Sequence, residues 1–383
     1  MDYFAEDHTR IGSISIIVEP QTQTQTLSPP TLTITSPTKV KLTSFKADFP
    51  DLTIDLPCET SLSPQRADLQ SFVSVKPNSG IISLKLPTVT SSNSRGKSSM
   101  NTLMHYDYRW SSKHLKSLES YSLHCRDCNS LILQSDSTQK LQVYEMPSES
   151  WAELMDFWHC HKPHDHSHSN QILTDKFKLQ TPANSIISAH YYITVNLEDR
   201  NLQRTLHKSD NQILCSQCQS VLGKYDTSNH LDMLLKWKCT LRANGDQKQH
   251  SFEPYMFVYY TLLDMLNSSG LRLMQFRSMN SDGHQEVTLL IWVFNTGVNY
   301  TLSDHSGSTC RDSLKVYYTT TDALISQERQ ARGDQIETMD VSWAVYSDTL
   351  ERVRSVNARL PRCVRGMGNV PGGDGWLMSF LGE

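Results

Sequence analysis

Two short cysteine pairs constrain the fold of this chain more than any other feature. Cys125 and Cys128 form one Cys-x-x-Cys motif, Cys215 and Cys218 form a second, and 86 residues lie between the inner cysteines. A pair at this spacing can place both sulfurs on one tight turn, and two such turns complete a tetrahedral metal site that excludes water. The motifs therefore predict a structural zinc site, a zinc-ribbon-like four-cysteine clip that joins distant segments.

Three other interpretations of the cysteine pairs are open. They could be redox-active, although neither pair has the strand followed by a helix N-terminus that such thiols need. They could be buried thiols without a metal. They could also belong to separate metal sites completed by His124, Cys160 or His161, because imidazole and thiolate both suit zinc.

The composition indicates a reduced protein of the cytoplasm or the nucleus. Nine cysteines in 383 residues are too few for a secreted disulfide scaffold. No apolar run reaches the roughly 18 residues that a membrane span requires, and the acidic N-terminus lacks the apolar core of a secretory signal. The net charge of −4 gives no basic field, so we expect no direct contact with nucleic acid.

The first hundred residues alternate between apolar and polar side chains, a period typical of strands with one buried face. Five runs show it: Ile14–Ile16, Leu32–Thr35, Val40–Leu42, Leu52–Leu56 and Ile82–Leu86. Their near-regular spacing predicts an antiparallel sandwich or open barrel. The alternative is a Ser/Thr-rich disordered tail, which would not keep the alternation.

A tryptophan-rich helix is predicted between the two cysteine pairs. Ser150 followed by Glu153 forms a capping box, so the helix should begin near Trp151. Its apolar stripe ends at Trp158, and Pro163 prevents the helix from continuing far beyond.

The loop that follows this helix is a candidate partner-binding site, made of Trp158, Cys160, His161, Lys162 and Pro163. A loop fixed by a proline could present its single thiol to a partner, even as a ligand for the partner's metal. The alternative is an ordinary helix end with a buried thiol.

The last third of the chain mixes helices and strands. We expect helices over Glu253–Leu266 and Val345–Leu360, and strands over Val287–Phe294 and Leu314–Thr319. The predicted class is α+β, mostly antiparallel β, with an N-terminal β-sandwich-like half and a few helices. The expected domains are a β-rich region (1–100), a zinc-clip region with the tryptophan helix and its loop (101–245), and an α+β region (246–383).

Cys363 is the best candidate for a nucleophilic thiol. Arg362 and Arg365 flank it, and nearby positive charge favours the thiolate. The alternative is an incidental surface cysteine. The sequence contains no phosphate-binding glycine loop and no Gly-x-Ser-x-Gly nucleophile motif, so an ordinary metabolic enzyme is not supported.

Several of these segments, taken in order, resemble the HECT-like ubiquitin-conjugating-enzyme-binding family of ubiquitin-protein ligases. The matching pieces are the following: Leu123–Cys128, Trp151–Pro163, Ile213–Cys218, Leu222–Gly223, Leu235–Lys238, Leu289–Phe294 and Trp376. The most specific is the Cys-His-Lys-Pro block after the tryptophan helix. The C-terminal end, Arg359–Glu383, differs from the surroundings of the nucleophilic cysteine in true HECT ligases.

The resemblance implies a protein that binds a ubiquitin-conjugating enzyme and passes ubiquitin to protein substrates through a thioester. It implies structural zinc on the four paired cysteines and makes Cys160–Pro163 the signature loop. It also implies a link to the zinc-dependent endonuclease of pre-mRNA 3'-end cleavage and polyadenylation. The alternative function is therefore a non-catalytic, zinc-stabilised binding factor, a chaperone or inhibitor of that endonuclease.

Overall fold

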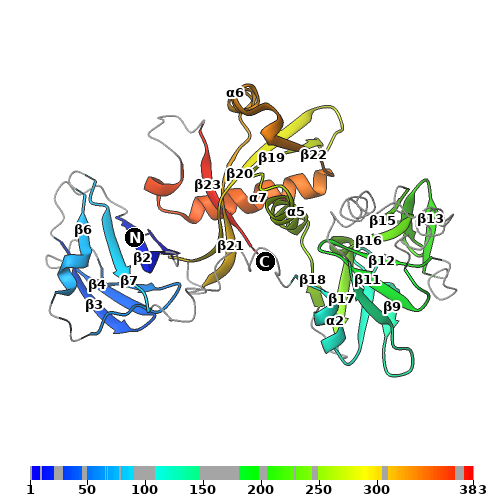
Figure 1. Ribbon diagram of the computed structural model, residues 1–383, viewed down its shortest axis with the longest axis horizontal. Coiled ribbons are helices and arrows are strands. Elements are labelled where there is room, and N and C mark those ends of the chain that lie inside the picture. Colours follow the sequence, from blue (N-terminus) through cyan, green and yellow to red (C-terminus); the bar gives the residue numbers. More distant parts are fainter. Residues whose placement is uncertain are drawn as a thin grey trace, which may run out of the picture. The chain divides into compact units, whose positions relative to one another are not determined.

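The computed structural model describes residues 2–8, 11–20, 29–44, 50–64, 66, 68–76, 79–89, 108–146, 181–197, 205–227, 230–243, 249–303, 309–366 and 375–382. The chain divides into two compact units (Figure 1). Unit 1 contains Met1–His105 and Thr261–Glu383, and unit 2 contains Tyr106–Tyr260. The boundary falls within helix α5 (Tyr255–Ser268).

Unit 1 is built mainly from strands. Its strands are β1 (Asp2–His8), β2 (Ser13–Glu19), β3 (Thr31–Ser36), β4 (Lys39–Thr43), β5 (Leu52–Asp55), β6 (Val73–Val75), β7 (Ile82–Pro87), β19 (Leu273–Met279), β20 (Glu286–Leu302), β21 (Cys310–Thr319), β22 (Ile336–Asp340) and β23 (Leu377–Leu381). Its further helices are α6 (Asp322–Arg332) and α7 (Trp343–Arg359).

The N-terminal strands form two facing layers. Strands β3, β4 and β5 make a three-stranded antiparallel sheet, and β2, β7 and β6 lie side by side in a larger one. Alternate residues of both layers are buried in one apolar cluster, with Ile16 of β2, Leu42 of β4 and Leu84 of β7 among its members. The period-two pattern therefore places one face of every strand in a shared core, as the sequence predicts for a sandwich-like half.

The larger sheet of unit 1 has nine strands and joins the two ends of the chain. The path runs β22-β19-β20-β1-β2-β7-β6, with β21 paired to β20 and β23 paired to β21. Strand β1 pairs with β20 antiparallel, with Phe4 opposite Leu302. The segments 1–100 and 246–383 thus contribute strands to the same sheet. Helix α7 packs on β23 and β19 and buries Val353 and Val356.

Unit 2 contains helix α2 (Ser112–Ser117), the start of α5 and two sheets in the part of the chain that the structure describes. The seven-stranded sheet contains β10 (Gln142–Glu145), β11 (Ser185–Ser188), β12 (Tyr192–Val195), β16 (Leu231–Leu235), β15 (Val221–Asp226), β14 (Gln212–Cys215) and β13 (Leu206–Ser209), in that order. The four-stranded sheet contains β18 (Gln249–Ser251), β17 (Cys239–Ala243), β8 (Tyr121–Cys125) and β9 (Leu131–Ser135).

The predicted fold class is confirmed. Both units are mostly antiparallel β-structure, with parallel pairs only at β10–β11 and β19–β22 among the described strands. The helices expected over Glu253–Leu266 and Val345–Leu360 are α5 and α7. Helices α2 and α6 were not predicted. The expected tryptophan helix lies outside the described residues. No helix in the described ranges is long and apolar enough to cross a membrane.

Candidate metal centre

The two Cys-x-x-Cys motifs of unit 2 form matching turns. In the first turn, the backbone N–H of Cys125 donates to the carbonyl of Ser130, and the N–H of Asn129 donates to the carbonyl of Cys125, both at 2.9 Å. Asn129 has a positive φ of 62°. This left-handed position, which asparagine tolerates well, reverses the chain directly after the second cysteine.

The second turn repeats this geometry 90 residues later in the chain. The N–H of Cys215 donates to the carbonyl of Ser220, and the N–H of Gln219 donates to the carbonyl of Cys215, again both at 2.9 Å. Gln219 has a positive φ of 63°. The first turn joins β8 to β9 and the second joins β14 to β15, so the two turns come from different sheets.

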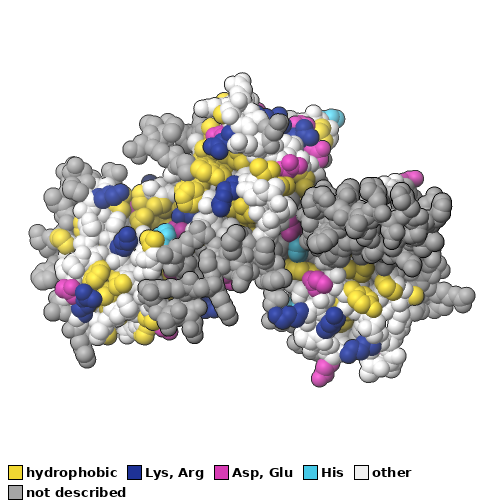
Figure 2. All heavy atoms as spheres, viewed as in Figure 1, with side chains coloured by type: hydrophobic (Ala, Val, Ile, Leu, Met, Phe, Trp, Pro, Cys, Tyr) yellow, Lys and Arg dark blue, Asp and Glu magenta, His cyan; other side chains and the backbone are white. Residues whose placement is uncertain are grey.

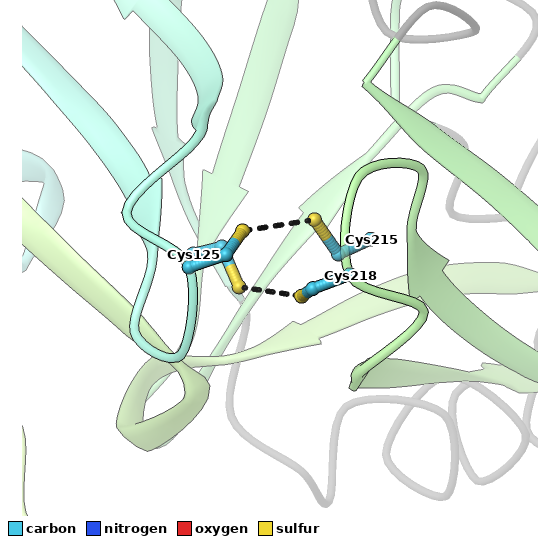
Figure 3. Close-up of side chains that lie close together, drawn as sticks. Cys125, Cys215 and Cys218 are labelled. Atoms are coloured by element: carbon cyan, nitrogen blue, oxygen red, sulfur yellow. Dashed lines mark hydrogen bonds between the residues drawn. The ribbon is translucent and has the colours of Figure 1, made fainter.

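The four sulfurs meet between these turns. Cys125 Sγ lies 3.7 Å from Cys218 Sγ, and Cys128 Sγ lies 3.7 Å from Cys215 Sγ. All four sulfurs lie within 4.8 Å of one another. Figure 3 shows the side chains of Cys125, Cys215 and Cys218 directed toward one another from the facing turns.

These separations fit a metal site and exclude disulfides. A disulfide would bring two sulfurs to about 2.05 Å. A tetrahedral ion with metal–sulfur bonds of about 2.3 Å holds its sulfur ligands about 3.8 Å apart. The arrangement can therefore hold a metal ion with four thiolates and no open position, which is a structural rather than a catalytic site.

Two serine hydroxyls contact the sulfurs. Ser130 Oγ lies 3.1 Å from Cys128 Sγ in its own turn and 3.2 Å from Cys215 Sγ in the other turn. Ser220 Oγ lies 3.1 Å from Cys218 Sγ. Each serine occurs two residues after the second cysteine of its motif, so the shared pattern is Cys-x-x-Cys-x-Ser. Sequence analysis did not identify the repeated serine as a contact of the cysteine sulfurs, although the repeat is visible in the sequence.

Hydrogen bonds and burial shift the pKa values of Cys125, Cys128 and Cys215 in different directions. The hydroxyl and the backbone N–H of Ser130 lower the pKa of Cys128 to about 6. Burial opposes ionisation of Cys215, but hydrogen bonds from Ser130 and from the turn backbone outweigh it and lower the pKa. Burial raises the pKa of Cys125 to about 12. Cys128 and Cys215 therefore ionise more readily than Cys125, and a bound cation would favour the thiolate in all four.

A fifth thiol lies beside the site. Cys239 of β17 is opposite Cys125 in the register of β8 and β17, and it is buried. Burial and the neighbouring Cys125 and Cys215 raise the pKa of Cys239 to about 12. Cys239 thus remains a neutral, buried thiol next to the cysteines of the candidate metal site.

Arg126 ties the first turn to the surrounding structure. Its guanidinium donates to the carbonyls of Trp237 and Phe252, each at 3.2 Å, and forms an ion pair with Glu253 at 3.0 Å. Its backbone N–H donates to the carbonyl of Lys238. The position of the first turn is therefore fixed by residues more than 100 positions later in the chain.

Strand β15, which follows the second turn, can pair with β16 because Gly223 is its third residue. A Cβ at this position would lie 1.9 Å from the carbonyl oxygen of Met233 on the neighbouring strand β16. Only glycine allows this close approach of two backbones.

Unit 2 also contains a completely buried lysine. Lys236 Nζ donates to the carbonyls of Ala189 at 2.6 Å, Arg109 at 2.8 Å and His190 at 3.3 Å. The same ammonium lies 4.5 Å from the ring centroid of Tyr108. Sequence analysis noted Lys236 only within a tryptophan-containing segment, and the polar Lys-Trp-Lys pattern gave no signal that this side chain is internal.

The other candidate residues lie in different environments. His124 is next to the metal centre in sequence, but its ring nitrogens contact Ser122 Oγ at 3.0 Å and the carbonyl of Asn129 at 3.1 Å. The predicted partner-binding residues Trp158, Cys160, His161, Lys162 and Pro163 lie outside the described residues.

Cys363 is in unit 1, in a short 3-10 turn (Arg362–Val364), and it is exposed. Partial burial of its thiol and the nearby carboxylate of Glu19 raise its pKa. The expectation that the flanking arginines favour the thiolate is therefore wrong, because burial is the larger cause of the raised pKa and the backbone N–H of Arg362 also brings the carboxylate of Glu19 close.

Comparison with known proteins places the whole chain in one family. An uncharacterized protein of Saccharomyces cerevisiae, YJR141W, is 27% identical over 275 residues, which cover 72% of each chain. No solved structure matches the protein described here. The sequence matches the family described as HECT-like ubiquitin-conjugating enzyme (E2)-binding over residues 6–371. Because this match spans both units, the protein belongs to the HECT-like E2-binding family.

Proposed function

We propose that the protein is a ubiquitin-protein ligase that binds a charged ubiquitin-conjugating enzyme and promotes transfer of ubiquitin to a protein substrate. The observation that carries this proposal is the family match over residues 6–371, whose description names E2 binding. In the transfer, a lysine amine of the substrate attacks the thioester carbonyl on the E2, and the E2 thiolate leaves. Binding that orients the thioester is sufficient to accelerate such a step.

The proposed cofactor is zinc, held by Cys125, Cys128, Cys215 and Cys218. The donor set and the 3.7 Å sulfur separations support this choice, because zinc accepts four thiolates in tetrahedral geometry. In this role zinc fixes the two turns of unit 2 and takes no part in the transfer.

Among the described cysteines outside the metal centre, none combines exposure with a lowered pKa. Cys58 is half-buried beside Asp7, and burial raises its pKa to about 12. Cys363 is exposed, but its pKa is also raised. These environments favour direct transfer from the E2 over a thioester on Cys58 or Cys363, with Cys363 kept as the candidate for a covalent route.

The test is discharge of an E2 charged with ubiquitin. Purified full-length protein should accelerate loss of the E2 thioester in the presence of lysine, and Cys363→Ala should retain that acceleration. A reducible ubiquitin adduct that forms on the wild type and disappears in Cys363→Ala would establish the covalent route instead. No acceleration with any E2 of a complete panel would contradict the ligase proposal.

The second candidate is a non-catalytic, zinc-stabilised binding factor for the endonuclease of pre-mRNA 3'-end processing. This function needs no activated thiol, and among the described cysteines outside the metal centre none is both exposed and lowered in pKa. Cys160→Ala should then abolish the complex with the endonuclease while leaving the metal content unchanged. Both functions are compatible with a protein of the cytoplasm or the nucleus, which is the proposed location.

A further inference from the structure

The two cysteine motifs differ in the residue that lies across the sheet from their first cysteine. Cys239 of β17 is opposite Cys125 of β8 in the strand register. At the equivalent place in the second motif, Leu206 of β13 is opposite Cys215 of β14. Both Cys239 and Leu206 are buried, so an apolar side chain is sufficient for packing at this position. The first motif therefore has a neighbouring thiol where the second has a leucine.

The backbone hydrogen bonds make Cys125 and Cys239 a closely spaced pair. The N–H of Cys125 donates to the carbonyl of Ser130 in its own hairpin, and the N–H of Cys239 donates to the carbonyl of Lys236 in its own chain segment. The two cysteines therefore exchange no N–H···O bonds with each other. In a pair of this kind the Cα atoms are about 4.5 Å apart. A disulfide accepts Cα separations of about 4.4–6.8 Å, so side-chain rotation is sufficient to join the two sulfurs.

An exposed sulfur gives solvent access to this buried pair. Cys125 is 1% exposed and Cys239 is 2% exposed, whereas Cys218 is exposed and its Sγ lies 3.7 Å from that of Cys125. An oxidant in solution therefore meets Cys218 first. Figure 2 shows charged side chains of both signs scattered over the described surface of unit 2 on this face of the molecule. Mixed charge of this kind steers neither anions nor cations, which suits an uncharged oxidant.

We propose that Cys125 and Cys239 are an oxidation site, at which a hydroperoxide converts the two thiols to a disulfide and the four-cysteine centre loses its metal. The thiol of Cys218 attacks one peroxide oxygen; an S–O bond forms, the O–O bond breaks and water leaves. The sulfur of Cys125 then displaces the new hydroxyl as a second water. Finally the sulfur of Cys239 attacks that of Cys125, and Cys218 leaves as a thiol with the proton of Cys239. Two thiols and one peroxide thus give one disulfide and two waters.

The last exchange is the slow step, because Cys239 enters it as a neutral thiol. Its product is buried, so thiol reductants in solution reach the bond poorly. A disulfide at Cys125 also leaves three sulfurs at a site built for four, which weakens metal binding. The inference rests on the zinc site of the proposed function and does not depend on ligase activity.

The experiment follows oxidation and recovery of the full-length protein. A pulse of hydrogen peroxide is ended with catalase, zinc release to a coloured chelator is recorded, and disulfides are mapped by mass spectrometry. Glutathione and zinc are then added, and the return of bound zinc is timed. We expect the wild type to contain the Cys125–Cys239 bond and to recover zinc roughly three-fold or more slowly than Cys239→Ala, whose disulfides all include an exposed sulfur or lie at the metal turns. Leu206→Cys reproduces the geometry at the second motif and should form a bond to Cys215.

The outcomes separate this inference from the proposed function. A wild type that forms disulfides only among the four motif cysteines overturns the oxidation site. Equal recovery rates for the wild type and Cys239→Ala also overturn it. If Cys239→Ala melts at a lower temperature than the wild type, Cys239→Val, which fills the space without a thiol, replaces it in the comparison. A purified protein without zinc overturns the proposed cofactor and the release of metal, and the disulfide map then still decides whether Cys125 and Cys239 form the bond.

Discussion

Ser130 Oγ lies 3.2 Å from Cys215 Sγ, although 85 positions separate the two residues in the chain. Ser130 also contacts Cys128, so one hydroxyl reaches sulfurs of both turns, whereas Ser220 contacts only Cys218. The two turns are otherwise alike. This difference makes the serines a matched pair for testing how hydrogen bonds outside the ligand set support a metal site.

We expect Ser130→Ala to accelerate metal loss more than Ser220→Ala. Removal of a hydrogen-bond partner of a ligand typically lowers metal affinity by about 10- to 100-fold, and only Ser130 serves both turns. The measurement is the rate of zinc transfer to an excess of chelator, with the absorption spectrum of the cobalt-substituted protein as a second readout. Equal rates for the two variants would contradict a bridging role for Ser130.

Single removal of Cys125 or Cys215 should give the same metal content. Each variant breaks one shared site, so each should lose one equivalent of zinc and lower the melting temperature of the protein. Elemental analysis of the purified variants checks this, with Cys363→Ala as a control that keeps the metal. A wild type with two equivalents of zinc, of which each variant keeps one, would indicate that the pairs bind metal separately.

Lys236→Met should destabilise the protein by about 2 kcal/mol or more, because one buried and two partly buried carbonyls would lose their donor. Lys238→Met is the control. Lys238 is two residues away and only half-buried, so its replacement should change the free energy of unfolding by less than about 0.5 kcal/mol. Denaturant titration of the full-length variants measures both. Similar values for both would show that the carbonyls find other donors.

Asp7→Asn should stabilise the protein at neutral pH and leave it unchanged near pH 3. Burial raises the pKa of Asp7, and its Oδ1 has no hydrogen-bond partner among the described residues. A raised pKa in the folded state means that stability falls as the pH rises through it, since the unfolded chain ionises more easily. Asparagine cannot ionise, so it removes this loss.

The measurement for Asp7 is the difference in melting temperature between the variant and the wild type across the pH range. That difference should be near zero at low pH and grow as the pH rises. A variant that is less stable than the wild type at neutral pH would contradict the assignment, because it would mean that the folded state favours the carboxylate.

The sequence by itself determined the local geometry of the metal turns and the strands of the N-terminal half. A Cys-x-x-Cys turn is closed by hydrogen bonds within six residues, from Cys125 to Ser130, so its shape follows from nearby residues alone. The alternation in runs such as Ile82–Leu86 likewise fixes which side chains are buried, because neighbouring residues on a strand face opposite sides.

Only the tertiary structure decided which distant groups meet. The pairing of Cys125 with Cys218, the junction of β1 with β20, and the burial of Lys236 under three carbonyls all join segments far apart in the chain. The contacts of Trp292 with Tyr317 and Trp376 are of the same kind, since strand register brings these three rings together. Local sequence patterns do not predict such contacts, because the pairing of strands depends on the free energy of the whole packed core rather than on any one segment.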